Sequence, residues 1–288
     1  MDYVLISDST ADLPIDVVKE LGVDIIPFSY SIDDKPYNYY LDERDGNVND
    51  FYVKLKSGAM PVTSQINPAI YKDTFKKYVK EGKGIIYLGF SSGLSGSLQS
   101  SVMAKNMVLE DYPDAKIEII DSLAASVGQG VFLYLAAKLK ESGKTMDELS
   151  AWIKERCTKV SHWFVVEDLF HLSRGGRLST VGAVVGSALK IMPILSVDEE
   201  GKLIVKAKVR GVNKAIDYLV SRTVDESENL SDMIAVIGHA DAMDKAEKIK
   251  ALVIEAGMKE ENIMIAPIGP IIGTHVGSGM AAIAFVPR

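Results

Sequence analysis

The chain has 288 residues, 47% of them apolar, with a single cysteine and a formal net charge of −7. This length and apolar content predict one large or two compact α/β units and exclude a largely disordered chain. The excess of 39 acidic over 32 basic residues argues against nucleic acid as the main partner, because phosphate binding needs a net basic face.

The single cysteine and the first residues of the chain indicate the cellular compartment. Cys157 has no partner for an intramolecular disulfide, which fits a reducing compartment, and no Cys or His at metal-ligand spacing, so we expect an inert thiol. Residues 1–5 lack a basic region followed by a long apolar run. No apolar stretch reaches the roughly 20 residues that span a bilayer. We expect a soluble, cytoplasmic protein.

The first half of the chain predicts a doubly wound, mostly parallel sheet, because it reads as four strand and helix units in succession. Carboxyl ends of parallel strands gather at one edge of such a sheet, so loop 7–14 is expected beside the loop after Phe90. Ordinary capping by Asp8, Ser9, Thr10 or Asp12 is the alternative role of that loop. The expected strands are residues 3–6, 24–32, 85–88 and 115–120; the expected helices are 15–21, 70–79, 98–108 and 131–139.

The most informative stretch is residues 85–97, an apolar strand that ends in seven residues of which six are Ser or Gly. A helix is expected from Leu98 to Val108. Unpaired N–H groups and the positive dipole end at the start of that helix favour an anionic ligand.

A second hydroxyl-rich loop, residues 58–68, precedes the helix at 70–79. Asn67 is the expected N-cap of this helix, with Pro68 at its first position. Thr63 and Ser64 are then free to bind a ligand, although ordinary hydrogen bonding within a loop explains them equally well.

The composition changes after a helix expected at 146–157, and the remainder predicts a second α/β domain with a mixed sheet. We therefore expect an N-terminal domain at 1–160 and a C-terminal domain at 161–288, with the ligand between them. The Gly/Ala/Val-rich residues 181–189 suit close helix packing or the wall of an apolar tunnel. The expected strands are 161–166, 190–197 and 203–209 (a hairpin), 233–237, 263–266 and a last strand through 286; the expected helices are 213–223 and 242–255.

One catalytic interpretation has to be weighed. Residues 89–93 satisfy the pattern G-x-S-x-G, which makes Ser91 a possible nucleophile. An α/β-hydrolase triad follows the chain order Ser, Asp, His, and here the acid would be Asp121 or Asp168 and the base His275. A serine esterase using Ser91 is therefore the alternative function. It is weakened because the loop continues to Ser97 before the helix and no Gly-rich oxyanion loop lies upstream.

Metal and phosphate chemistry has little support. The histidines are scattered, and none lies in a pattern such as H-E-x-x-H; the Ser/Gly loop lacks the Gly-Lys-Ser/Thr ending of a phosphate loop. His275 is different, because it lies in a Gly-flanked turn, residues 273–279, whose tight backbone can project an imidazole. A structural histidine is the alternative there.

These pieces are unified by a ligand with a small anionic end and a long apolar remainder. Thr63, Ser95 and backbone N–H groups would bind a carboxylate, and His275 would donate a further hydrogen bond. Apolar side chains from both domains would cover the chain. Each buried methylene contributes about 0.8 kcal/mol, so the tail would supply most of the gross affinity.

Five stretches occur in an order typical of one known family: residues 8–13, 63–65, 91–97, 174–178 and 273–277. On these stretches the chain resembles the DegV family of bacterial fatty-acid-binding proteins over essentially its whole length. The resemblance implies two α/β domains around one long-chain fatty acid, with no cofactor, no metal and no catalytic activity of the protein's own. It places the carboxylate near Thr63, Ser95 and His275, and we add Ser64 and Gly96 from the same loops.

The same resemblance implies a partner, an ATP-dependent fatty-acid kinase that makes an acyl phosphate for phospholipid synthesis. Arg174 and Arg177 would then meet the partner or neutralise phosphate, and a structural ion pair with Glu167 or Asp168 is the alternative. We also expect transient contact with a membrane. Ile66 and Ser278 stand where the family often has Pro, which alters loop stiffness rather than the contacting groups.

Overall fold

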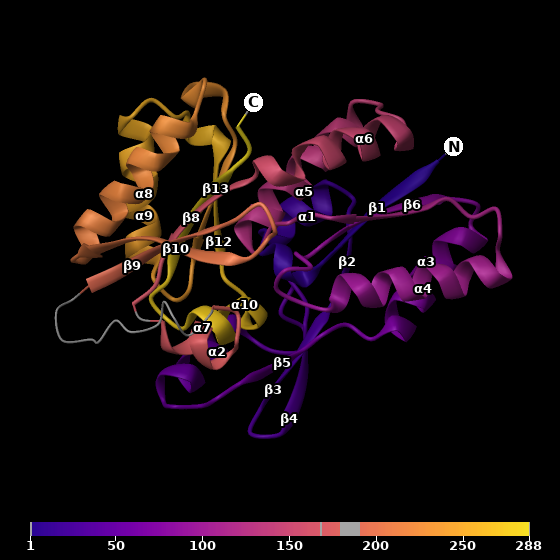
Figure 1. The fold of residues 1–288 in the computed structure, drawn as a ribbon, viewed down its shortest axis with the longest axis horizontal. Helices are drawn as coiled ribbons and strands as arrows, with labels where there is room; N and C mark the ends of the chain where they lie inside the picture. The colour runs from indigo at the N-terminus through magenta and orange to yellow at the C-terminus, as the bar shows by residue number, and fades with distance from the viewer. Residues whose placement is uncertain (1, 168, 179–190, 288) are drawn as a thin grey trace.

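The computed structural model describes residues 2–167, 169–178 and 191–287. It contains a parallel sheet, a mixed sheet and a small antiparallel sheet, with helices packed around them (Figure 1). The expected class, a two-domain α/β protein with one parallel and one mixed sheet, is confirmed. Strands of the parallel and small sheets all precede residue 160, and those of the mixed sheet all follow it. The boundary between residues 160 and 161 stays a prediction.

The parallel sheet has the order β2-β1-β6-β7. Strand β6 is buried along its whole length beside β1, as its apolar run requires of a central parallel strand. Strand β1 is followed by β2 at one edge of the sheet, and β6 is followed by β7 at the other edge. The strand order therefore reverses between β1 and β6, and the loops that follow these two strands meet there. The strands are β1 (Tyr3–Asp8), β2 (Asp24–Ile26), β6 (Gly84–Gly89) and β7 (Ile117–Asp121).

Helices cover both faces of this sheet, with α5 and α6 on one side and α3 and α4 on the other (Figure 1). Asn67 caps α3 by accepting a hydrogen bond from the Ala69 N–H at 2.8 Å, and Pro68 is its first residue, which confirms the predicted start. Helix α5 begins four residues before the expected 131, at Val127. The helices are α1 (Ile15–Glu20), α2 (Val48–Lys56), α3 (Pro68–Lys80), α4 (Ser97–Asp111), α5 (Val127–Glu141) and α6 (Met146–Arg156).

The small sheet, of order β4-β3-β5, corrects two sequence expectations. Residues 24–32 are not one strand: the chain leaves the parallel sheet at Pro27, which has no N–H for a ladder bond. Asp33 and Asp34, both at positive φ, then turn the chain into a hairpin. Thr63 and Ser64 lie on a strand of this sheet rather than in a loop. The strands are β3 (Phe28–Ile32), β4 (Lys35–Tyr39) and β5 (Val62–Ser64).

The mixed sheet has the order β10-β9-β8-β13-β11-β12, and the expected β9–β10 hairpin is present. Helices α8 and α9 pack on one face, while the other face is turned towards the parallel sheet (Figure 1). Residues 181–189, expected as tunnel wall or packed helix, lie outside the described residues. The elements are β8 (Ser161–Val165), β9 (Ile191–Val197), β10 (Leu203–Arg210), α8 (Val212–Glu226), β11 (Ala235–His239), α9 (Met243–Glu255), β12 (Ile263–Pro267) and β13 (Ala281–Phe285).

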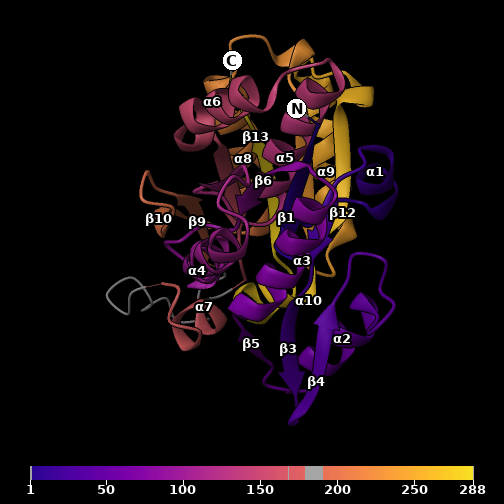
Figure 2. The same cartoon turned by 90° about the vertical axis from the view of Figure 1, so that its right-hand side faces the viewer.

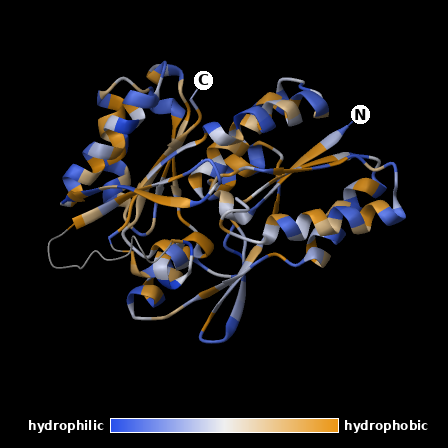
Figure 3. Cartoon of the chain, in the orientation of Figure 1, coloured by the Kyte–Doolittle hydropathy of each residue, from blue (hydrophilic) through white to orange (hydrophobic). Residues whose placement is uncertain are grey.

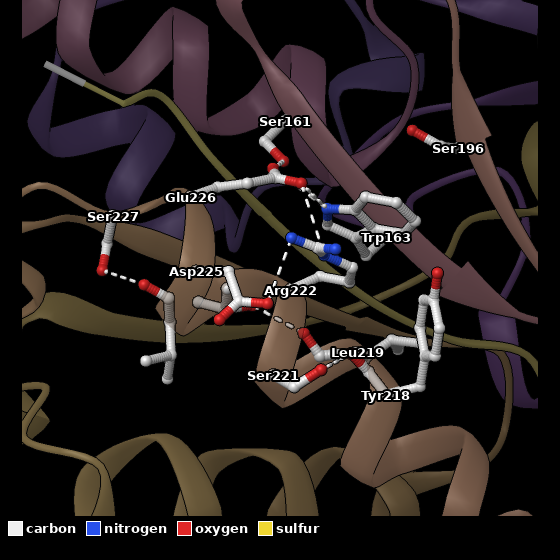
Figure 4. A network of polar contacts seen from close by, with 12 residues as sticks. Ser161, Trp163, Ser196, Tyr218, Leu219, Ser221, Arg222, Asp225, Glu226 and Ser227 are labelled. Atoms are coloured by element: carbon white, nitrogen blue, oxygen red, sulfur yellow. Dashed lines mark hydrogen bonds and ion pairs between the residues drawn. The ribbon is translucent and has the colours of Figure 1, made fainter.

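A polar network fastens α8 to the mixed sheet on the face away from the N-terminal half (Figure 4). The indole N–H of Trp163 lies 3.1 Å from both carboxylate oxygens of Glu226, and the Ser161 hydroxyl donates to the same group. Arg222 approaches Glu226 at 3.8 Å and lies over the Trp163 ring. Because these contacts hold Trp163 against α8, its β8 neighbours His162 and Phe164 present their side chains to the opposite face.

Two short helices lie where the halves of the chain meet, α7 (Phe170–Arg174) and α10 (Pro270–Val276). The Gly-flanked turn predicted around His275 is wrong in its first part, because residues 270–276 are helical. Pro270 is pre-set for the first helical position, and Gly277 ends the helix at a φ of 76°. Figure 2 shows α10 beside β3, β5 and α2, so this C-terminal helix packs among N-terminal elements.

Apolar residues concentrate on the strands and on the inward faces of the helices (Figure 3). One apolar cluster joins the parallel sheet to the inner face of the mixed sheet, and a second lies between the mixed sheet and helices α8 and α9. Among the described residues, no helix is long and apolar enough to cross a membrane.

Candidate functional site

The loops after β1 and β6 meet around the buried carboxylate of Asp8. It accepts hydrogen bonds from the Tyr87 hydroxyl at 2.7 Å and from the Phe90 N–H at 3.1 Å, so the two loops abut as expected. Asp8 also caps a 3₁₀ turn through the Thr10 N–H, the alternative role foreseen for this loop. Burial raises the pKa of Asp8, and the hydrogen bonds it accepts act in the opposite direction.

A cavity of about 310 Å³ lies between these loops and the inner face of the mixed sheet. Its walls come from β5, the loop after β6, the start of α5, the inner faces of β8 and β13, and α10. The structure brings together most of the residues that the sequence singled out. Those that line the cavity are Thr63, Ser64, Ser95, Gly96, Arg177 and His275.

Thr63 and His275 form the centre of the polar end of the cavity. Oγ1 of Thr63 lies 2.9 Å from Nε2 of His275, a hydrogen-bond distance. The other ring nitrogen, Nδ1, is buried, has no hydrogen-bond partner among the described residues, and faces Gly175 so closely that a Cβ there would overlap it.

His275 is neutral at physiological pH. Burial is the largest cause, and Arg177, Arg174 and His171 add to it, so that the pKa of His275 falls to about 4. The imidazole therefore carries one N–H, and the Thr63 contact is a hydrogen bond between neutral groups. The two arginines leave the surrounding field positive.

Ser95 and Gly96 stand at the entrance to α4. The Ser95 hydroxyl donates to the Ser97 hydroxyl at 3.0 Å and accepts from the Ser97 N–H at 3.2 Å, so it binds the first residue of the helix, whose N-cap is Gly96. A side chain at position 96 would overlap Oε1 of Gln65, which also lines the cavity. Gly96 thus makes room for Gln65, and its direct approach to a ligand stays a prediction.

The two arginines hold the loop after α7 against the N-terminal half. Arg177 donates from Nε to the Leu94 carbonyl at 3.1 Å and from Nη1 to the Gly175 carbonyl at 2.6 Å. Arg174 contacts the carbonyls of Pro61 at 3.4 Å and Thr274 at 3.5 Å. Of the carboxylates expected as alternative partners, Glu167 lies 3.0 Å from Lys245 instead, and Asp168 lies outside the described residues.

The remainder of the cavity is mostly apolar. Sequence reasoning did not identify its residues, because an apolar strand shows alternation without showing which face a ligand touches. His162 lies among these residues: its ring contacts the Val160 carbonyl at 3.1 Å and the Ala125 N–H at 3.4 Å, and burial lowers its pKa to about 4. The apolar wall includes Phe90, Leu94, Val127, Phe164, Ile271, Ile272, Val276, Ala282 and Ala284.

The contacts of Ser91 do not form a hydrolase triad. Its hydroxyl donates to the Gly201 carbonyl at 2.8 Å and accepts from the Gly93 N–H at 3.1 Å. His275 contacts Thr63 instead, and Asp121 binds the backbone N–H groups of Ser92 and Leu123. Ser91 therefore supports the turn and the hairpin beside it.

No group of three or more His, Cys, Asp or Glu side chains within residues 2–167, 169–178 and 191–287 is arranged to hold a metal ion. The chemistry available in the cavity is hydrogen bonding and positive charge at one end and apolar contact along the rest. Fold and site define a two-domain α/β protein with a pocket between its sheets that is polar at one end.

Comparison with known proteins identifies the family. The family model described as "Uncharacterised protein, DegV family" matches residues 3–288, and the chain belongs to the DegV family. A DegV domain-containing protein of Clostridium perfringens is 39% identical over 286 residues, which cover 99% of this chain and 97% of the relative. One from Streptococcus pyogenes is 37% identical over 287 residues, covering 98% and 97%.

Solved structures of fatty-acid-binding DegV proteins share the fold. The protein from Streptococcus agalactiae is 30% identical with a TM-score of 0.87, covering 100% of this chain and 99% of that one. DegV of Bacillus subtilis, described as a fatty acid binding protein, is 28% identical with a TM-score of 0.85 and full coverage of both chains, 100% each.

Proposed function

We propose that this protein binds a long-chain fatty acid, with the carboxylate in the cluster of Thr63, Ser64, Ser95, Gly96 and His275 and the acyl chain along the apolar wall. The observation that supports this most directly is the pocket itself, which combines hydroxyls, a neutral imidazole and Arg177 around the Thr63–His275 contact with mostly apolar side chains elsewhere. The fatty-acid-binding relatives of the same fold support the same ligand class.

The polar end suits a carboxylate because donors and positive charge converge there. With Nε2 of His275 donating to Thr63, the Thr63 hydroxyl proton is free for the ligand, and the Ser95 hydroxyl turns from Ser97 to do the same. Each charge-assisted hydrogen bond contributes about 1.5–3 kcal/mol. The anion also offsets the charge of Arg174 and Arg177.

The apolar end suits an acyl chain in both size and composition. A volume of about 310 Å³ lies at the lower end of the range of about 300–1,000 Å³ usual for small-molecule pockets. At about 0.8 kcal/mol per buried methylene, the tail supplies most of the gross affinity, and the head group selects the acid.

We further propose that the protein is a cytoplasmic carrier without catalytic activity of its own, organised as domains 1–160 and 161–288. It would present the carboxylate to an ATP-dependent fatty-acid kinase, whose acyl phosphate product serves phospholipid synthesis. Arg174 and Arg177 would contact the partner or the phosphate. Val62 and Phe170, 59% and 53% exposed, are apolar side chains on β5 and α7 that suit a transient membrane contact.

Native mass spectrometry of the purified protein, followed by extraction, tests the binding. We expect one bound fatty acid per chain; a ligand-free protein that takes up no acid after delipidation would contradict the proposal. Ser95→Ala and His275→Ala should each weaken binding of a fatty acid more than of the matching alcohol. Equal losses for both ligands would mean that these residues only shape the pocket.

The carrier role is tested separately by adding a fatty-acid kinase and ATP to the loaded protein. Formation of acyl phosphate supports presentation to the kinase. Binding without acyl phosphate, with kinases that act on related carriers, would instead indicate a lipid-sensing protein.

A further inference from the structure

Asp12 is a buried carboxylate that the proposed contacts with the ligand do not use. It lies in the loop after β1, only 1% exposed, at a left-handed φ of 43°. Its Oδ1 accepts a hydrogen bond from the Gly269 N–H at 2.9 Å, and its Oδ2 accepts from the Ser126 hydroxyl at 2.7 Å. Both donors are far away in the sequence, so this carboxylate joins three separate segments.

The two donors stand at the starts of two helices that form walls of the pocket. Gly269 directly precedes α10, which contributes Ile271, Ile272 and His275 to the lining. Ser126 directly precedes α5, which contributes Val127 to the lining. The backbone of Ser126 has a φ of 54°, which is unfavourable for a residue other than glycine and has to be stabilised by contacts such as the one with Asp12. One carboxylate therefore fixes where both helices begin.

The start of α10 is embedded in the N-terminal half by further contacts. The Tyr52 hydroxyl donates to the Ile268 carbonyl at 2.8 Å, and the ring of Tyr39 lies so close to Gly269 that a Cβ there would overlap it. His275 follows Gly269 by six residues on one helix, about 9 Å along its axis. Because a short helix moves as a rigid body, a displacement at Gly269 is transmitted to the imidazole.

We propose that Asp12 is a positioning residue of the carboxylate site, which holds His275 at hydrogen-bond distance from Thr63 by fastening the start of α10. This inference rests on the proposed function, since it assigns Asp12 to the same head-group site. Asp12 touches neither the ligand nor the imidazole and acts through the helix.

Asp8 supplies the matched comparison, because it is a second buried carboxylate, at the end of β1 where the same loop begins. Its partners, Thr10, Tyr87, Phe90 and Gln129, all belong to the N-terminal half, and α10 is not among them. A general requirement for buried carboxylates in this loop would make the two positions alike. The positioning role makes them different.

Binding of a fatty acid and of the matching alcohol is measured for full-length Asp12→Asn, Asp12→Ala and Asp8→Ala proteins, and Asp8→Ala should bind both ligands like the parent. Asparagine at position 12 retains an acceptor for the Gly269 N–H and a polar partner for Ser126. We therefore expect the Asp12→Asn protein to bind the acid with an affinity within about twofold of that of the parent. Alanine leaves both donors unpaired, and we expect it to weaken acid binding on the order of tenfold and alcohol binding much less. In a His275→Ala background, Asp12→Ala should have little further effect on the acid.

The ¹⁵N shifts of the His275 ring in the ligand-free proteins give a second measurement that does not depend on fatty-acid binding. We expect Asp12→Ala to move them and Asp12→Asn and Asp8→Ala to leave them unchanged. If Asp12→Ala does not fold, Asp12→Ser, whose shorter side chain cannot span both donors, takes its place. Unchanged ring shifts, or equal losses with and without His275, would overturn the proposal. Altered ring shifts in a protein that binds no fatty acid would refute only the proposed function.

Discussion

Oγ1 of Thr63 lies 2.9 Å from Nε2 of His275, although 212 positions separate the two residues in the chain. One belongs to an edge strand of the small sheet and the other to the last turn of α10. The contact exists only when the C-terminal helix is docked on the N-terminal half. The polar end of the pocket is thus a product of the complete fold.

This contact predicts that Thr63 and His275 act together on a bound carboxylate. Thr63→Ala and His275→Ala should each weaken fatty-acid binding, and the double variant should lose less than the sum of the two losses. Coupling of about 0.5–3 kcal/mol is usual for residues in one hydrogen-bond network. Calorimetry on the four proteins measures it, with Thr74→Ala on α3, outside the pocket lining, as control; strictly additive losses would show that the two residues bind independently.

The imidazole should titrate differently in the empty and loaded proteins. In the ligand-free protein, burial and Arg177 hold the pKa of His275 at about 4. A carboxylate in the pocket favours the charged imidazole, so binding should raise the pKa and take up protons as the pH falls towards 5. NMR titration of the His275 ring with and without fatty acid checks this, and an unchanged pKa would place the carboxylate elsewhere.

The sequence predicted the parts of this site whose signals are local. Asn67 before Pro68 marked a helix start, and the Ser/Gly run after Phe90 marked a loop that lines the pocket, because capping and turn chemistry depend on a few adjacent residues. His275 lines the pocket, and its contact with a ligand stays a prediction, but the turn expected around it was wrong. Gly273 and Gly277 read as a turn, whereas tertiary packing of α10 against α2 favours a helix.

Other features required contacts between distant segments. Thr63 and Ser64 read as loop residues because Val62–Ser64 is too short for a strand signal and gains its hydrogen bonds from β3. Gln65 and Phe164 were not identified as pocket residues, since no local pattern distinguishes a side chain facing a cavity from one facing a core. The split at Pro27 was readable from its missing N–H, and the apolar run around it masked that signal.

Gly175 should be intolerant of a side chain because of His275. A Cβ at this position would overlap Nδ1 of the imidazole and crowd the His171 carbonyl, while the backbone φ of −73° itself accepts alanine. Gly175→Ala should therefore displace His275 and weaken acid binding on the order of tenfold, with little change in alcohol binding. Ser173→Ala, on the same helix, is the matched control; normal acid binding by Gly175→Ala would show that the ring moves without consequence.

The stability of the protein should depend on pH because of Asp12. Burial raises the pKa of this carboxyl to about 7, above its unfolded value near 3.8. Its contribution to stability is thus fully present below about pH 4 and is lost as the pH rises through about 7, by at most about 1.4 kcal/mol per pH unit. Asp12→Asn should lack this loss, so the free energy of unfolding of the variant should rise relative to that of the parent between pH 5 and pH 8. Urea unfolding at several pH values measures this, and a difference between the two proteins that does not change with pH would contradict the raised pKa.

The inner face of β13 should set how long an acyl chain the pocket accepts. Ala282 and Ala284 line the cavity, whereas their neighbour Ala281 points into the separate core beneath α8 and α9. Ala282→Leu adds three carbons to the pocket wall and takes room from about as many ligand methylenes, a loss of about 2 kcal/mol for the longest acid that fits. Shorter acids should bind as before, because the head-group cluster is untouched.

Ala281→Leu provides the control for this prediction. The same change on the opposite face overpacks the C-terminal core and should lower stability by about 1–3 kcal/mol without altering chain-length preference. Extraction of the acids bound to each variant from an equal mixture of chain lengths, with thermal unfolding alongside, separates the two effects. A preference that is unchanged in Ala282→Leu, or shifted equally in Ala281→Leu, would mean that the acyl chain does not run along β13.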